Sequence, residues 1–132
     1  MISIAIGKGK FPMENGGNNY IMILETKVIE SEKIYQMLSP KEKDRDKKIE
    51  RILRKLVEKN LKKRYDVVVI LPPSWSIDPI EIYAKDKIIE KISKLFERCG
   101  LEYEILKVKN EIKKMLVDLD ISSIKWLLKE IN

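Results

Sequence analysis

The strongest chemical signal in this sequence is a cluster of basic residues between positions 41 and 64. This segment contains twelve Lys/Arg and five Asp/Glu, a net charge of +7, whereas the whole chain carries +6. Five of the cations recur at helical spacing and fall within about a quarter-turn of one another: Lys48, Arg51, Lys55, Lys59 and Lys62. A row of cations at successive helical turns matches the phosphate backbone of nucleic acid. We therefore predict that these five residues bind nucleic acid.

The same charges also fit the solvated face of a long helix. Glu50 precedes Arg54 by four residues, and Glu58 precedes Lys62 by four. Pairs at this spacing form ion pairs that support a helix without any partner. No zinc finger, recognition-helix signature or RNA-binding aromatic pattern accompanies the charge. The sequence leaves both interpretations open.

A second candidate site is the loop that follows the most strongly predicted strand, Tyr65–Leu71. Three residues of this loop, Ser74, Trp75 and Ser76, come directly after a pair of prolines. Ligands of open α/β sheets bind outside the carboxyl ends of the strands. A tryptophan in this position could stack on a base, cover the core or contact another subunit. We predict that these three residues bind a ligand.

The glycine-rich segment Gly7–Asn19 would complete this site. It contains four of the five glycines, and Lys8 and Lys10 follow the first predicted strand. The spacing matches neither a Walker A loop nor a dinucleotide fingerprint. If the first strand is parallel to Tyr65–Leu71, Lys8 and Lys10 lie at the same edge of the sheet and could bind the phosphate of a nucleotide. The alternative is that the segment is only a connection between two strands.

Residue counts exclude several kinds of site. The chain has no histidine, and Cys99 is the only cysteine. An internal disulfide, a Cys/His zinc site and any imidazole-based catalytic triad are therefore excluded. We predict no metal and no cofactor. Cys99 is interpreted as a core residue of a chain that works in a reducing compartment.

Acidic residues near position 104 bear on nuclease chemistry. A restriction-type site needs a carboxylate and a lysine separated by one residue on a strand, but Glu104 and Lys107 are separated by two and face opposite sides. Glu102 and Glu104 share a face and could hold a metal together with Asp66 or Asp118. Paired glutamates on an edge strand are more often solvated groups that prevent aggregation. The sequence therefore gives little support to a nuclease.

A strand–loop–helix–strand unit positions the second site. The run from Tyr65 to Leu71 is typical of a strand buried in a parallel sheet. The residues Asp78-Pro79-Ile80-Glu81 combine a cap, a proline and a carboxylate, which predicts a helix start. Apolar residues continue at helical spacing to Cys99, and Gly100 can end the helix. The strand Leu101–Val108 would then lie parallel to Tyr65–Leu71 through a right-handed crossover.

Six further elements complete the prediction. They are strands at Ile2–Ile6 and Tyr20–Ile29, and helices at Ser31–Leu38, from Ser39-Pro40 to about Lys63, after the cap Asn110, and at Ile121–Ile131. No linker divides the chain. The sequence therefore predicts one Rossmann-like α/β domain over residues 1–132, with about four mostly parallel strands and flanking helices in two or three layers.

The remaining composition concerns setting and assembly. No window approaches the length of an apolar membrane span, and the first residues lack the layout of a signal peptide, so we expect a cytoplasmic protein without a membrane partner. One glutamine, no histidine and abundant isoleucine, lysine and glutamate are typical of archaeal-like, hyperthermophilic proteins. Trp126 lies off the apolar stripe of the last predicted helix and could anchor a homodimer.

The order of a strand, a glycine-rich loop, the run VVVILPP, a helix and the run CGLEYEILKV resembles, in layout from Ile2 to Val108, the Rossmann-like sensor domains associated with CRISPR systems. That resemblance implies a dimer that binds cyclic oligonucleotides at strand ends. Our leading hypothesis is a non-catalytic module that binds nucleic acid or a phosphate-bearing nucleotide. The alternatives are a nucleotide-processing or phosphodiesterase enzyme of the ring-nuclease kind, and a structural or assembly protein.

Overall fold

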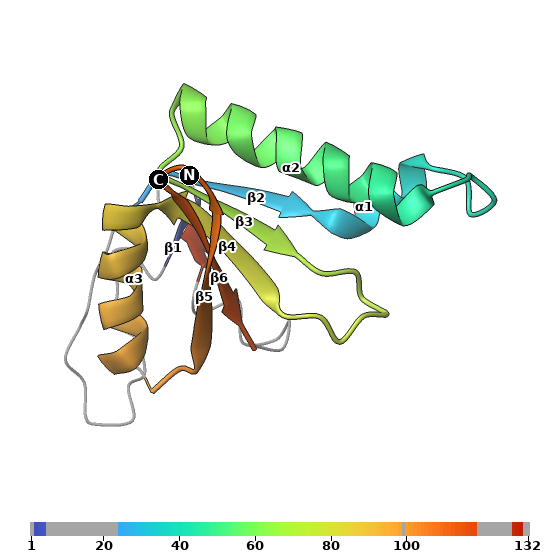
Figure 1. The fold of residues 1–132 in the computed structure, drawn as a ribbon. Helices are drawn as coiled ribbons and strands as arrows, with labels where there is room; N and C mark the ends of the chain where they lie inside the picture. Colours follow the sequence, from blue (N-terminus) through green and yellow to red (C-terminus); the bar gives the residue numbers. More distant parts are fainter. Residues whose placement is uncertain (1, 5–23, 99, 119–127, 131–132) are drawn as a thin grey trace.

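The computed structural model describes residues 2–4, 24–98, 100–118 and 128–130. Within these residues, seven strands form one sheet and three helices accompany it (Figure 1). The strands are β1 (Ile2–Ile4), β2 (Thr26–Glu30), β3 (Val67–Leu71), β4 (Ile80–Lys85), β5 (Tyr103–Lys109), β6 (Ile112–Val117) and β7 (Leu128–Glu130). The helices are α1 (Ser31–Met37), α2 (Arg45–Lys63) and α3 (Asp86–Arg98). None of these helices is long and apolar enough to cross a bilayer.

The sheet is mostly antiparallel. Its strand order is β5-β6-β4-β3-β2-β1-β7, and β2 and β3 form the one parallel pair among the described strands. Every other neighbouring pair is antiparallel. The mixed α/β class is thus confirmed, but the prediction of about four mostly parallel strands is wrong. The strand Tyr103–Lys109 pairs with β6 at the edge of the sheet and does not lie beside β3.

Two helices, α2 and α3, pack on opposite faces of the sheet. Figure 1 shows α2 above the sheet and α3 against its other side. The core on the α3 face is the larger, and alternate residues of β3, β4 and β6 pack there with Phe96. The core on the α2 face is smaller and contains Ile29, Val57, Val68 and Ile70. Alternation along β3 explains this division, because successive strand residues point to opposite faces.

The segment from Ile80 to Lys85 is a strand and not the beginning of a helix. Ile80, Ile82 and Ala84 are buried and alternate with the half-buried Glu81 and Tyr83. Apolar residues at positions 80, 84 and 88 fit a helical period, but those at 80, 82 and 84 fit a strand. The strand period prevails because β4 pairs with β3 and β6 on its two sides. The helix begins only at Asp86, and the predicted parallel crossover does not exist.

The segment after Asn110 is also a strand rather than a helix. Asn110 adopts a positive φ of 50° and, with Glu111, forms the tight turn between β5 and β6. Asparagine tolerates this left-handed conformation, which two-residue hairpin turns require. Met115 and Val117 are buried on the α3 face. The final predicted helix is contradicted at its end, where Leu128–Glu130 form β7, and residues 119–127, with Trp126, lie outside the described residues.

The elements before β3 partly match the prediction. Ser31 begins α1 as expected, but its hydroxyl donates to the carbonyl of Leu71 at 2.6 Å instead of capping the helix. The next helix begins at Arg45 and not at Ser39-Pro40, because Asp44 is left-handed, with a φ of 54°. The strand predicted at Tyr20–Ile29 is seen as Thr26–Glu30, and residues 20–23 are outside the described range.

Candidate nucleic-acid interface

Helix α2 is fixed to the sheet by one face. Ile49 and Val57 are buried, and Leu53, Leu56 and Leu61 pack against the smaller core. Asn60, the one side-chain amide in the helix, donates to the carbonyl of Leu56 at 2.7 Å. Because the apolar face packs on the sheet, the side of α2 that faces away from the sheet is exposed.

Four of the five predicted cations lie on this outward side. Arg51, Lys55, Lys59 and Lys62 are all exposed, and we call them the cationic stripe. Steps of four residues separate the first three by about 6 Å along the helix axis. Within the described residues, none of the four forms an ion pair. The cationic stripe is therefore a row of charges without a counterion in the part of the chain that the structure describes.

The fifth predicted cation does not belong to this row. The ammonium of Lys48 is half-buried and lies 2.5 Å from the carboxylate of Glu42. Of the two supporting ion pairs expected from the sequence, Arg54 and Glu50 are 3.6 Å apart. Glu58 instead pairs with Lys109 of β5, also at 3.6 Å, so Lys62 has no carboxylate partner among the described residues. Ion pairs within the fold thus explain the charges of Arg54 and Lys48 but not those of the cationic stripe.

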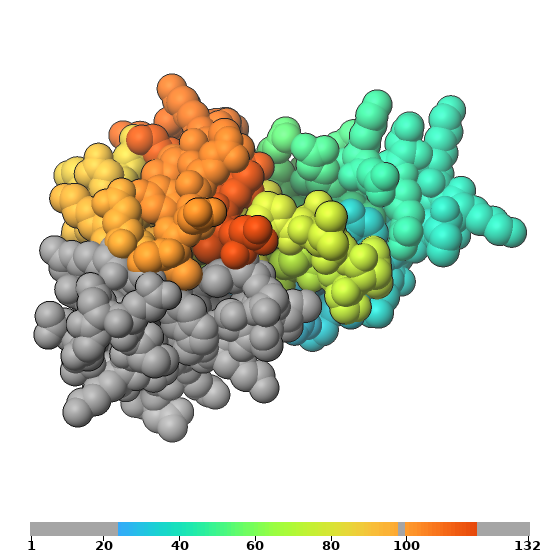
Figure 2. Space-filling view, turned by 90° about the horizontal axis from the view of Figure 1, so that it is seen from below, coloured from blue at the N-terminus to red at the C-terminus, as the bar shows by residue number. Residues whose placement is uncertain are grey.

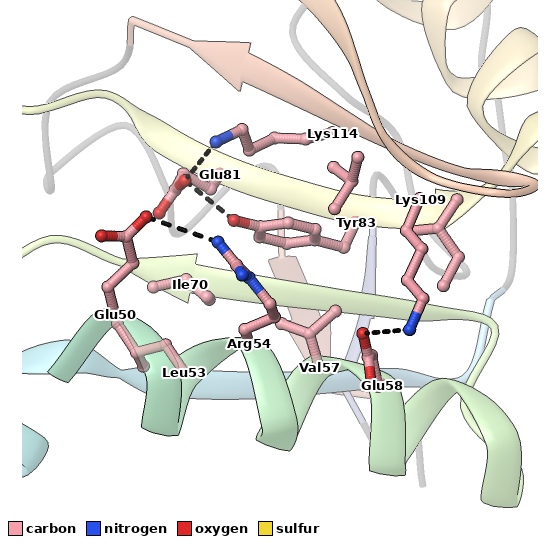
Figure 3. A pocket seen from close by; sticks show the side chains of 12 residues that line it. Glu50, Leu53, Arg54, Val57, Glu58, Ile70, Glu81, Tyr83, Lys109 and Lys114 are labelled. Atoms are coloured by element: carbon pink, nitrogen blue, oxygen red, sulfur yellow. Dashed lines mark hydrogen bonds and ion pairs between the residues drawn. The ribbon is translucent and has the colours of Figure 1, made fainter. Parts of the chain in front are cut away.

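A small cavity of about 130 Å³ lies between α2 and the sheet (Figure 3). At its wall, Glu81 of β4 accepts a hydrogen bond from the Tyr83 hydroxyl at 2.9 Å and lies 3.3 Å from the Lys114 ammonium. Figure 3 shows the pairs Arg54–Glu50 and Lys109–Glu58 on the α2 side of the same cavity. Each cation drawn there faces a carboxylate. The ion pairs at the cavity wall therefore neutralise these cations, and little unpaired charge faces the cavity to bind a ligand.

Burial and, to a lesser degree, the charge of Glu81 raise the pKa of Tyr83 far above its ordinary value. The folded chain thus holds the phenol proton more tightly than the unfolded chain, in which tyrosine titrates at about pH 10. Tyr83 therefore makes its full contribution to the free energy of unfolding below about pH 10, and this contribution falls as the pH rises further. The sequence did not indicate Tyr83, because its strand was assigned to a helix.

Exchanging Tyr83 for phenylalanine should make stability less sensitive to alkali. The loss of the hydrogen bond to Glu81 should lower the free energy of unfolding by about 1 kcal/mol near neutral pH. Above about pH 10 the gap between Y83F and the native chain should narrow, because only the native chain carries the phenol. Urea unfolding of both proteins across this range measures the effect. Parallel curves for the two proteins would show that Tyr83 does not titrate in this way.

The loop after β3 is held by its serines. The backbone N–H and the hydroxyl of Ser74 both donate to one oxygen of Glu32, at 3.1 and 2.5 Å, which lowers the pKa of that carboxyl. The hydroxyl of Ser76 accepts from the N–H of Asp78 at 3.0 Å. Trp75 is 64% exposed and contacts the ring of Tyr35 edge to face, with centroids 6.0 Å apart.

The predicted partners of this loop lie outside the described residues. The segment Gly7–Asn19, with Lys8 and Lys10, is not described, so its approach to the loop stays a prediction. Tyr35, which contacts Trp75, also contacts Arg45 at the start of α2. Its guanidinium lies 5.3 Å from the centre of the Tyr35 ring and donates to the Tyr35 carbonyl at 2.7 Å. The loop and the start of α2 are thus joined through Tyr35.

The acidic residues near position 104 do not form a metal site. Glu102, Glu104 and Asp118 line one shallow groove beside Tyr103 and Leu116. No group of three or more acidic or cysteine side chains in the described residues is arranged to hold a metal ion. Asp66 lies elsewhere and accepts a hydrogen bond from the N–H of Glu25 at 3.0 Å. The described acidic residues therefore give metal chemistry no support.

Comparisons with known proteins add no assignment. No protein-family model matches the chain, and neither curated proteins nor solved structures include a match.

Proposed function

We propose that this protein binds the phosphate backbone of nucleic acid through the cationic stripe on α2. The observation that carries this proposal is the exposure of Arg51, Lys55, Lys59 and Lys62 in one row, with no carboxylate partner among the described residues. Four cations held close together repel one another, and a polyanion relieves that repulsion while it releases its own counterions. The packed face of α2 fixes the row in place before binding.

The chemistry of the stripe favours contact with the backbone rather than with base edges. Arginine and lysine side chains on an outward helix face reach phosphate oxygens, which carry no sequence information. Asparagine or glutamine would read adenine, but Asn60 is turned inward and bonded to the Leu56 carbonyl. We therefore propose binding that depends on salt and little on sequence.

The enzymatic alternative has weaker support. The hydroxyls of Ser74 and Ser76 are both engaged in hydrogen bonds. The carboxylate beside Ser74 belongs to Glu32, and its lowered pKa makes it a poor general base. A binding role uses features that the structure displays, whereas catalysis needs a group that activates one of these serines.

Titration of labelled single- and double-stranded DNA and RNA at increasing salt tests the proposal. Four phosphate contacts should give a slope of log K against log salt of about −3 to −4 on duplex DNA. The affinity should then fall about 100-fold between roughly 50 and 200 mM salt. Scrambling the sequence of the duplex should change the affinity little. Absence of binding at the lowest salt, or a slope near zero, would remove the proposal.

A further inference from the structure

Strand β5 is an edge strand with an unusual degree of exposure. It lies at one end of the sheet, and β6 is its one hydrogen-bonded neighbour among the described strands. Of its seven residues, all but the first are exposed. Figure 2 shows the orange and red-orange atoms of the β5–β6 region at the surface of the molecule. The backbone N–H and C=O groups on the outer side of β5 thus form a template for another strand.

Large aliphatic side chains occupy the middle of this exposed strand. Ile105, Leu106 and Val108 are 37%, 38% and 37% exposed. Ile105 lies on the α3 face with Met115, and Leu106 lies on the α2 face with Lys114. Apolar groups are thus exposed on both faces of the edge. A strand that is apolar and unpaired gains most from pairing with a further strand, which covers both faces at once.

We propose that β5 pairs in antiparallel fashion with β5 of a second copy of this chain. The charge pattern of the strand is self-complementary. Glu102 and Glu104 lie at its beginning, and Lys107 and Lys109 lie at its end. An antiparallel arrangement of two identical strands places the acidic end of each beside the basic end of the other. A partner strand of uniform charge would match only half of β5, whereas a second copy matches all of it.

Symmetry restricts the register of this pair. A two-fold axis normal to the sheet keeps equal faces together, so it must lie midway between the two copies of one residue, which then pairs with itself. With the axis at Leu106, the two Leu106 side chains face each other. Glu104 then lies opposite Val108 and near Lys109 of the second copy. The irregularity of β5 between Lys107 and Lys109 disturbs pairing beyond this point, which limits the contact to one short segment.

The pair gives a closed dimer rather than a fibre, because each copy uses its single β5 edge once. A single strand pair buries less surface than a permanent interface, so we expect exchange between monomer and dimer in the micromolar range. If α2 binds nucleic acid as proposed above, the dimer would present both α2 helices on the same face of the joined sheet. Two cationic stripes could then engage one polyanion together.

Cysteine scanning tests the register. In a Cys99→Ser background, single cysteines are placed at positions 103 to 108 in turn and oxidised, with Arg51→Cys as a control on the far side of α2. Disulfide dimers should peak at one position, Leu106, because only the residue on the axis meets its own copy within disulfide distance. Equal yields at every position, or a yield no higher than for Arg51→Cys, would overturn the proposal.

Charge exchange tests the pairing without relying on oxidation. Glu104→Lys and Lys109→Glu each create two like-charged contacts in their own homodimer, and each should weaken dimerisation about tenfold. Lys109→Glu also breaks the ion pair with Glu58 inside each monomer, so the free energy of unfolding of this variant is measured as well. In an equimolar mixture of the two variants, each lysine at 104 meets a glutamate at 109, so the heterodimer should recover native affinity. Recovery also shows that both variants are folded.

Sedimentation equilibrium without nucleic acid measures these affinities, so the result is independent of the proposed function. A chain that stays monomeric up to high concentration would overturn the inference. A dimer that ignores both charge changes would do the same, since it must use another surface.

Discussion

The variant R51Q/K55Q/K59Q should bind nucleic acid about 100-fold more weakly than the native chain at low salt. Each substitution removes one phosphate contact, worth on the order of 1 kcal/mol at an exposed position. The slope of log K against log salt should become shallower by about three on duplex DNA. Fluorescence anisotropy over a salt series measures both quantities. All three positions are exposed, so the free energy of unfolding should stay within about 0.5 kcal/mol.

Helix α3 offers a matched control for this loss of charge. Lys87, Lys91 and Lys94 are exposed and recur at similar helical spacing, but they share their helix with Glu90 and Glu97. The variant K87Q/K91Q/K94Q removes the same net charge from the opposite face of the sheet. It should retain nearly all of the native affinity. Equal weakening in both variants would mean that binding follows net charge alone and that the cationic stripe is not the surface.

Replacing Ile82 with alanine should lower the free energy of unfolding by about 2–5 kcal/mol. Ile82 of β4 is fully buried in the larger core, where it packs with residues of α3. Removing its outer carbon atoms leaves a cavity that this core cannot refill. A domain of this size has a total stability of about 5–15 kcal/mol, so the midpoint of urea unfolding should fall markedly.

The same substitution distinguishes a strand from a helix at this position. On the helix that the sequence predicts from Asp78, Ile82 would lie roughly half a turn from Ile80 and Ala84 and would be exposed. Its replacement would then cost little. Ile77→Ala provides the control, since Ile77 is fully exposed and its loss should be nearly neutral. A neutral effect at both positions would contradict the strand β4.

The fold could be predicted in its class but not in its topology. Clear single-period segments were correct, such as the buried run at β3 and the amphipathic body of α2. The errors fall where a few apolar residues fit two periods, at Ile80–Ala84 and Ile112–Leu116. Such short runs are decided by their neighbours in the sheet, which are distant in sequence. Asn110 had the chemistry of both a helix cap and a hairpin turn, and pairing of β5 with β6 selects the turn.

The candidate site shows the same division. The outward exposure of the cationic stripe follows from helical periodicity, which is local information. The pairing of Lys48 with Glu42 and of Glu58 with Lys109 depends on how the chain packs, and the sequence pattern did not indicate either pair. The pair Tyr83–Glu81 was missed because it requires β4. The residues Lys8, Lys10 and Trp126 lie outside the described part of the chain, so their roles stay predictions.

The parallel pair of β2 and β3 has a consequence for chain entropy. Thr26 pairs with Val67, 41 positions later, whereas Lys109 and Ile112 close a two-residue turn. Closing the longer loop costs about 2–3 kcal/mol more by the logarithmic rule for flexible chains. Helix α2 lies inside that loop, and its rigid turns shorten the segment that must be ordered. The cationic stripe therefore becomes a fixed surface only after α2 has docked and this loop of 41 positions has closed.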